Sequence, residues 1–269
     1  MKFHPQHAEI LLKFTQSILG SDEPPETQIR HLWINIAHLK AMALAQLLGN
    51  TIGNAVYAGP FKGMKLTPAA MSGIFGPYLT GSYEHELHAS FEKIITTPYQ
   101  TILNIGCAFG YYATGLALRM LNTTVRAFDI SEVEQQRCRD MAALNQVDNR
   151  VKVSGLFEGG DFANYAGQKT FVLMDIEGGE KTLLDPVLYP ALQKMDILVE
   201  LHDVLDSTLS KAITDRFAAT HDITFITNSA TLFDFSPFTG TAYVDPFESL
   251  IINWENRDGP TPWAVMTAK

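Results

Sequence analysis

Acidic side chains and one histidine gather in two short segments in the second half of the chain. The first segment, Asp175 to Glu180, places three carboxylates and two glycines directly after an apolar run. The second is Glu200-Leu201-His202-Asp203, which also follows an apolar run. An imidazole has an ordinary pKa near neutral pH, so His202 is the first candidate for a general base. Asp175 and Glu177 are further candidates for the catalytic group.

The same carboxylates offer a second kind of chemistry. Asp175, Glu177, Glu200 and Asp203 supply the hard oxygen ligands that Mg²⁺ or Mn²⁺ prefers. A divalent metal is therefore an alternative to base catalysis, and we do not assign one from the sequence. The segment His85-Glu86-Leu87-His88 differs from the H-E-x-x-H zinc pattern because its histidines are three residues apart, so we expect no zinc site there.

A glycine loop, Asn104-Ile105-Gly106-Cys107-Ala108-Phe109-Gly110, joins a predicted strand to a predicted helix. Open α/β sheets bind ligands at such junctions. The dinucleotide fingerprint is G-x-G-x-x-G, whereas the spacing here is G-x-A-x-G, one residue shorter. The shorter spacing favours S-adenosyl-L-methionine (SAM), which has no phosphate to bind, over NAD.

An acid ends the next predicted strand. Asp129 lies 23 residues after Gly106, one strand–helix–strand unit along the chain. A carboxylate at this place can accept hydrogen bonds from both hydroxyls of a ribose. NAD enzymes use an acid at the same place, so Asp129 indicates a nucleoside without choosing which one.

The elements that must position these residues follow from hydrophobic periodicity. Before residue 98 we expect helices over 5–19, 27–48 (capped by Gly49-Asn50) and 82–95, with an irregular stretch over 53–81 that contains a tight turn at 59–64. Beyond it the pattern predicts strands over 101–106, 125–129, 151–153, 171–175, 197–201, 223–227 and 263–266, and helices over 111–121, 132–145, 181–195 and 207–219. Strands that alternate with helices indicate a doubly wound, Rossmann-like parallel sheet. We therefore expect an N-terminal helical extension and pre-core segment over 1–98 and a ligand-binding core over 99–269.

Composition narrows the possible partners. The chain has 29 acidic and 20 basic residues, a net charge of −9, and no basic cluster, which argues against nucleic acid. Its two cysteines, Cys107 and Cys138, indicate neither a disulfide framework nor a metal spacing. The start lacks the pattern of a signal peptide, and no apolar stretch approaches the roughly 20 residues of a membrane span. We expect a cytoplasmic protein without a membrane partner, and a possible homodimer contact on the N-terminal helices near Trp33.

The glycine loop, Asp129, the acid-rich segment 175–180 and Glu200-Leu201-His202 together resemble the class I SAM-dependent methyltransferases, and among these the FkbM-type family. The resemblance implies a seven-stranded sheet whose last strand is antiparallel. It also implies O-methylation of a hydroxyl on a sugar or small natural-product-like acceptor. The cofactor contacts it implies are Asn104, Gly106, Cys107, Ala108, Gly110, Tyr112, Asp129, Ile130 and Asp175, with Tyr83 and Glu86 closing near the methionine end.

Two positions of the loop depart from the family pattern. Asn104 stands where the family usually has an acid, and Ala108 replaces a glycine. Asn104 can still accept a hydrogen bond but brings less charge complementarity to a cationic cofactor. Two alternatives stay open: an NAD-dependent oxidoreductase, against which the glycine spacing argues, and a SAM-binding protein without catalysis, against which the acid-rich strand ends argue.

Overall fold

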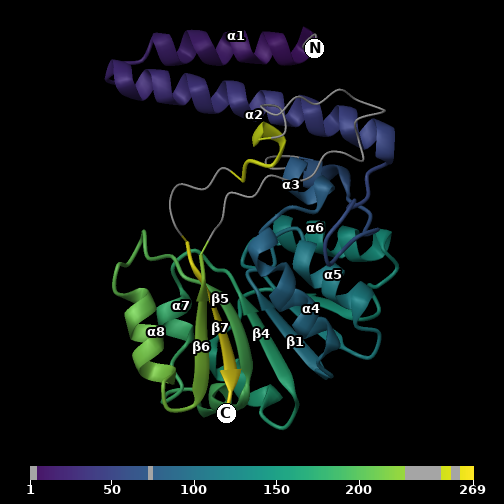
Figure 1. The fold of residues 1–269 in the computed structure, drawn as a ribbon, viewed down its shortest axis with the longest axis vertical. Coiled ribbons are helices and arrows are strands. Elements are labelled where there is room, and N and C mark those ends of the chain that lie inside the picture. Colours follow the sequence, from purple (N-terminus) through teal and green to yellow (C-terminus); the bar gives the residue numbers. More distant parts are fainter. Residues whose placement is uncertain (1–4, 72–74, 228–249, 256–260) are drawn as a thin grey trace.

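The computed structural model describes residues 5–71, 75–227, 250–255 and 261–269, and one seven-stranded sheet forms its centre (Figure 1). The strands are β1 (Thr101–Ile105), β2 (Thr124–Phe128), β3 (Val151–Ser154), β4 (Thr170–Met174), β5 (Asp196–Glu200), β6 (His221–Ile226) and β7 (Trp263–Ala268). Their order is β3-β2-β1-β4-β5-β7-β6, and only β7 runs antiparallel to its neighbours. This is the Rossmann-like sheet with an antiparallel last strand that the sequence predicts, so the expected fold class is confirmed.

The central strands are buried on both faces. Every residue of β1 and β4 is buried, and alternate residues of each strand enter two different hydrophobic clusters. Ile102 and Leu173 join the cluster on the side of α5 (Tyr111–Arg119) and α6 (Glu132–Leu144). Leu103 and Val172 join the cluster that includes residues of α8 (Leu209–Phe217). Apolar runs such as TILNI and TFVLM fit this arrangement, because a strand with two covered faces has no solvent side to keep polar.

The residues before β1 pack onto the same core. They form α1 (Pro5–Leu19), α2 (Pro25–Ile52), η1 (Pro68–Met71), α3 (Phe75–Thr80), η2 (His85–Leu87) and α4 (His88–Thr96), where η marks a 3-10 helix. The tight turn expected at 59–64 is present, since the backbone N–H groups of Val56 and Gly63 donate to the carbonyls of Met64 and Val56 at 2.8 Å. Phe61 of this turn packs its ring edge-on against Phe91 and Tyr111. The turn thereby anchors the pre-core segment to α5.

The helix expected over 181–195 is wrong. Only α7 (Glu180–Leu183) and the 3-10 helix η4 (Pro190–Lys194) form there. Asp185 accepts hydrogen bonds from the backbone N–H groups of Val187 and Leu188 at 2.9 and 3.1 Å, which is a turn rather than a helix. A proline at 186 also disfavours helical backbone in the residue before it.

Three other boundaries differ from expectation. Helix α2 continues through Gly49-Asn50 to Ile52, and it is followed by Gly53, whose φ of 84° is a positive value that glycine adopts readily. A Cβ on Gly49 would lie 2.6 Å from Oδ1 of Asn54, so that glycine serves a close contact instead of a cap. The stretch expected to be irregular contains the fully buried helix α3. The helix expected over 82–95 begins only at residue 88, after Glu84 with φ 45° and the single turn of η2.

Helix α2 has the length and composition of a membrane span. Its most apolar window has a mean hydropathy of 1.2, and 39% of that window is buried within the protein. The expectation that no apolar stretch approaches this length is therefore wrong for residues 25–52. The buried share lies mainly in the C-terminal half, where Leu44 and Leu48 enter the hydrophobic cluster beside α5.

Candidate active site

The glycine loop after β1 is held tightly between two strand ends. The backbone N–H groups of Gly106 and Cys107 both donate to the carbonyl of Phe128 at 2.9 Å. Gly106 has a φ of 79°, and a Cβ there would lie only 1.6 Å from the carbonyl oxygen of Asp175 at the end of β4. Gly110 likewise has a φ of 89°, and its Cβ would lie 2.7 Å from Sγ of Cys138 on α6. Both glycines are thus required by close contacts within the protein.

Asp129 completes this loop. Its Oδ2 accepts the N–H of Ala108 at 2.9 Å, and its Oδ1 accepts the N–H of Ser131 at 2.9 Å. Ala108 has a φ of 43°, which costs an L residue about 1–2 kcal/mol, and the hydrogen bond to Asp129 helps to hold that conformation. Each carboxylate oxygen keeps a second lone pair for a ribose hydroxyl. The structure therefore brings the predicted acid to the predicted loop.

Two further loop residues have clear environments. Asn104 is buried, and its Oδ1 accepts no hydrogen bond from the residues that the structure describes. Leaving such an atom unsatisfied costs about 1–3 kcal/mol, so a donor on a ligand would be stabilising there. The Cys107 thiol is hydrogen-bonded to Cys138 and buried, and both effects raise its pKa well above the usual range. Cys107 is therefore a neutral packing residue and not a nucleophile.

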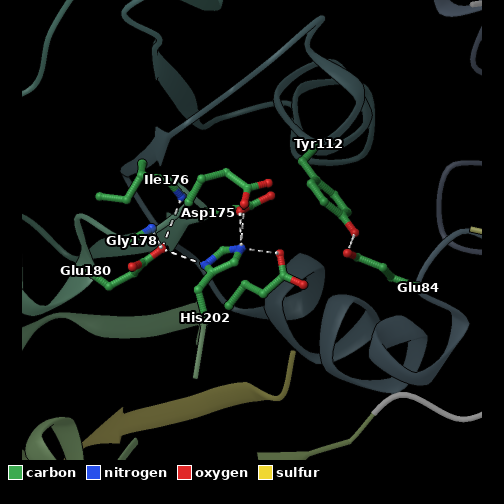
Figure 2. Close-up of polar contacts among 9 residues, drawn as sticks. Glu84, Tyr112, Asp175, Ile176, Gly178, Glu180 and His202 are labelled. Carbon is green, nitrogen blue, oxygen red and sulfur yellow. Dashed lines mark hydrogen bonds and ion pairs between the residues drawn. The ribbon is translucent and has the colours of Figure 1, made fainter. Parts of the chain in front are cut away.

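His202 lies at the carboxyl end of β5 with a carboxylate on each side of its ring (Figure 2). Its Nδ1 lies 2.9 Å from Oε1 of Glu180, a residue with no exposed surface. Its Nε2 lies 3.2 Å from Oε2 of Glu177 and 3.7 Å from carboxylate oxygens of Asp175 and Glu200. The bond to Glu180 fixes the proton on Nδ1 and directs Nε2 towards the other acids.

The charges in this cluster shift the pKa values in opposite directions. The hydrogen bond to Glu180 raises the pKa of His202, against the effect of burial, and the charges of Glu180, Glu200 and Glu177 add to the rise. Burial raises the pKa of Asp175 well above its usual range, and the charges of Glu200 and Glu84 raise it further. For Glu180, burial acts upward, but the hydrogen bonds from His202 and from backbone N–H groups lower the pKa overall. Asp175 is thus disposed to carry a proton, while Glu180 stays ionised.

Glu180 also shapes the segment that it ends. Its Oε1 accepts the N–H of Gly178 at 3.2 Å and that of Ile176 at 3.4 Å. The loop between them needs two unusual backbone conformations, with φ 54° at Glu177 and 112° at Gly178. This leaves the Glu177 side chain 80% exposed at the rim of the cluster. The sequence marked Glu180 only as one of three acids, and its contact with His202 was missed.

Glu84 is the second residue that sequence reasoning missed. It is buried and accepts a hydrogen bond from the hydroxyl of Tyr112, a predicted cofactor contact on α5 (Figure 2). Its backbone N–H donates to Oε1 of Glu255 at 2.9 Å. Because its charge acts on Asp175, Glu84 lies close to the strand-end acids although it precedes them by 91 residues. In the sequence, the one signal for Glu84 is that it is an acid next to the predicted contacts Tyr83 and Glu86.

The other predicted contacts lie around this centre. Tyr83 packs in an aromatic cluster, 4.4 Å from Tyr78 and 6.0 Å from Tyr112 between ring centroids. The Glu86 carboxylate lies 3.4 Å from Nδ1 of His85. Ile130 is a large apolar side chain that stands exposed directly after Asp129. The roles of these three residues stay predictions.

Part of the acid cluster fits a metal ion. One ligand atom from each of Asp175, Glu200 and His202 lies within 4.8 Å of the other two. An imidazole whose second nitrogen binds a carboxylate, as His202 binds Glu180, is the usual support of a metal-ligating histidine. Asp203 does not belong to this set, because its carboxylate binds the backbone N–H and the hydroxyl of Ser210 at the start of α8. A nitrogen ligand beside two carboxylates suits Mn²⁺ better than Mg²⁺.

Comparison with known proteins gives distant structural likenesses. No protein-family model and no curated protein matches the chain. An O-methyltransferase of Bacillus cereus in complex with SAH is 13% identical over 85% of this chain and 90% of that chain, with a TM-score of 0.42. An rRNA methylase of Streptococcus thermophilus is 11% identical over 68% of this chain and 96% of that chain, with a TM-score of 0.46. At identities this low, function must be inferred from the residues of the site itself.

Proposed function

We propose that this chain is a SAM-dependent methyltransferase that transfers a methyl group to a hydroxyl of a sugar or small natural-product-like acceptor. The observation that carries the proposal is the position of His202. Its Nδ1 is bound to buried Glu180 and its Nε2 faces Asp175. Asp175 follows β4, which pairs with β1 ahead of the glycine loop, and Asp129 follows β2 on the other side of β1. The proposed nucleoside site and the proposed general base then lie along one edge of the sheet, as methyl transfer to a hydroxyl requires.

The charge of the site suits a cationic cofactor. Carboxylates of Asp175, Glu177, Glu180 and Glu200 lie around His202, and the charge of Glu84 acts on Asp175. When bound, SAM supplies a methyl group on a positively charged sulfur that is also the leaving group. Asn104 would accept a hydrogen bond from its amino group through the buried Oδ1, and Asp129 would bind its ribose hydroxyls.

The protein's own contribution is alignment and proton removal. A hydroxyl is a weak nucleophile until its proton leaves, and a positioned base is worth about 10²- to 10⁴-fold in rate. Nε2 of His202 takes that proton, and ionised Glu180 stabilises the resulting imidazolium through Nδ1–H. Glu177 covers Nε2 from the rim, and its 80% exposed side chain can move aside for an acceptor.

The proposal extends the resemblance to the FkbM-type family, whose D-x-E-G-x-E and E-x-H residues correspond here to Asp175–Glu180 and Glu200–His202. The acidic cluster argues against an NAD-dependent oxidoreductase, because two phosphates would lie near several carboxylates. It also argues against a protein that only binds SAM, since binding alone needs no buried histidine–carboxylate pair.

A thermal-shift experiment tests the cofactor. SAM and its demethylated product should raise the melting temperature, with a stabilisation of about 2.7 kcal/mol at 100 times the dissociation constant, while NAD should not. Stabilisation by NAD alone would overturn the proposal. Transfer of labelled methyl from SAM to a panel of hydroxylated acceptors then tests the chemistry, with His202→Gln as the inactive control.

A further inference from the structure

One side of α2 carries a largely apolar stripe. Its positions alternate in spacing between three and four residues, which is the seam pattern of a coiled coil. They are Glu26, Ile29, Trp33, Ile36, Lys40, Ala43 and Leu47. Four of them are large apolar side chains that remain exposed in the folded chain, with exposed fractions of 68% (Ile29), 59% (Trp33), 42% (Ile36) and 40% (Leu47).

Within the part of the chain that the structure describes, the four large side chains of this stripe stay exposed. Helix α1 packs alongside α2 across one end of the molecule (Figure 1). The hydrophobic core takes a different side of α2, through Ala41, Leu44, Ala45 and Leu48. The stripe runs for about 30 Å at 1.5 Å per residue. A row of exposed Ile, Trp and Leu side chains of that length is typical of an interaction surface.

We propose that α2 pairs antiparallel with α2 of a second copy of this chain, so that the protein is a dimer joined through its N-terminal helices. The two charged positions of the stripe decide the direction. A parallel pair would place Glu26 beside Glu26 and Lys40 beside Lys40. An antiparallel pair centred between Trp33 and Ile36 places Lys40 of one copy in the layer next to Glu26 of the other, and Trp33 packs against Ile36 across the axis.

The exposed apolar area suits a small interface. At roughly 150–250 Å² for a fully covered large side chain, the four exposed side chains of the stripe would contribute on the order of 300–500 Å² per copy. The two copies together would bury on the order of 600–1,000 Å² through these side chains, against the roughly 1,000 Å² expected of a specific interface. Helix α1 carries further exposed apolar side chains, Ile10, Leu12, Phe14 and Leu19, that could add to this area.

Sedimentation velocity over about 1–100 µM tests the pairing, with a matched set of single variants. The wild-type chain should sediment at twice its mass of 29.8 kDa. Trp33→Glu should weaken the dimer at least about 30-fold, as expected for an interface tryptophan. Val187→Glu is the control, since Val187 is 82% exposed but lies in the loop after α7, and this variant should dimerise like the wild type.

A charge exchange tests the direction. Glu26→Lys and Lys40→Glu should each weaken the dimer, and the double variant should restore it, because both cross-axis pairs are then opposite in sign again. Restoration is specific to an antiparallel pair of identical helices. A monomeric wild type would overturn the proposal. So would a monomeric chain that binds anionic phospholipid vesicles and loses that binding in Trp33→Glu, since the stripe would then contact a membrane. Failure of the double variant to recover would overturn the antiparallel register.

Discussion

Nδ1 of His202 lies 2.9 Å from Oε1 of Glu180, and both side chains are buried. Glu180 starts α7 and His202 follows β5, so the pair links the segments that follow two neighbouring parallel strands. The same carboxylate oxygen receives the N–H of Gly178, which ties the loop conformation to the histidine. Orientation of the base and shape of the acid-rich loop therefore depend on one side chain.

The first prediction concerns the titration of His202. In the folded chain its pKa is raised, so His202 should titrate above about 6.5 and act as a base only above that pH. Glu180→Gln should lower this pKa, because the neutral amide stabilises the imidazolium less. The acidic limb of the rate profile should move to lower pH, and the maximal rate should fall about 10- to 100-fold.

NMR titration of the imidazole protons checks this prediction, and a second histidine provides the internal reference. His221 is also buried, but burial lowers its pKa, and its Nε2 lies 2.8 Å from the carbonyl of Met195. The two histidines should titrate on opposite sides of 6.5, and Glu180→Gln should move only His202. An unchanged His202 in that variant would contradict the role assigned to Glu180.

The second prediction separates two reasons why a position requires glycine, a positive φ and a close contact with neighbouring backbone. At Gly167 the φ is not positive and a Cβ would meet open space. Gly63 has a φ of 87°, and a Cβ there would have nothing within 4 Å. Gly106 has a positive φ, and a Cβ there would lie 1.6 Å from the carbonyl oxygen of Asp175. Gly167→Ala should leave the free energy of unfolding within about 0.5 kcal/mol of wild type. Gly63→Ala should cost about 1–2 kcal/mol. Gly106→Ala should cost clearly more, or prevent folding.

Urea unfolding of the three variants measures this series. The Gly106 effect includes a clash with backbone of β4, which cannot rotate away as a side chain can. Equal costs for the variants of Gly63 and Gly106 would show that β1 and β4 separate easily at this end, and would count against a rigid loop.

Patterns of neighbouring residues in the sequence predict most strands of the sheet, and they predict some residues of the candidate site but not others. The strands were recognisable because each is a short apolar run between polar segments, and Asp129 and His202 were recognisable because ligands bind where such strands end. What failed was decided by distant contacts. Helix α3 forms where glycine and proline predict a loop, and a Cβ on its Gly76 would lie 2.1 Å from the carbonyl of Ile252.

The missed acids follow the same logic. Glu84 belongs to the pre-core segment, and no local pattern places it near Asp175, because the fold of residues 55–99 against α5 creates that proximity. Glu180 was in the recognised segment, but its partner is 22 residues away, beyond a helix that the sequence predicted wrongly. Periodicity predicts elements, while the pairing of titratable groups depends on how these elements pack.

The third prediction concerns Asp129. Asp129→Ala removes the acceptor of the Ala108 and Ser131 N–H groups as well as the proposed ribose contact. The variant should fold with a melting temperature lower by about 2–4 °C, which corresponds to roughly 1 kcal/mol, and should show no shift with SAM or SAH. Asp140→Ala is the control, because Asp140 is an exposed acid on α6 whose side chain accepts a hydrogen bond from Gln136 of the same helix. A full cofactor shift in Asp129→Ala would remove this residue from the ribose site.

The fourth prediction concerns the stability cost of the acid cluster. An acid whose folded pKa is raised binds its proton more strongly in the folded than in the unfolded state, so its contribution to stability falls as the pH rises from about 4 towards the folded value. Asp175 is such an acid. Asp175→Asn should therefore be more stable than wild type by about 1 kcal/mol at pH 8, with a smaller difference at pH 5. Asp140→Asn should change neither stability nor its pH dependence.

The fifth prediction decides between a proton and a metal at this position. If Asp175, Glu200 and His202 hold a divalent ion, millimolar Mn²⁺ should raise the melting temperature of the wild type and leave Asp175→Asn unchanged. The ion would then replace the proton on Asp175, so the gain should be larger at pH 8 than at pH 5, where the proton and the metal compete. A wild type that shows no shift with Mn²⁺ or Mg²⁺ and keeps full methyl transfer in EDTA would leave His202 as the base without a metal. In that case a neutral Asp175 beside Nε2 raises the pKa of His202 less than a charged one would, so that the imidazole is free of its own proton at a lower pH and can then accept that of the hydroxyl.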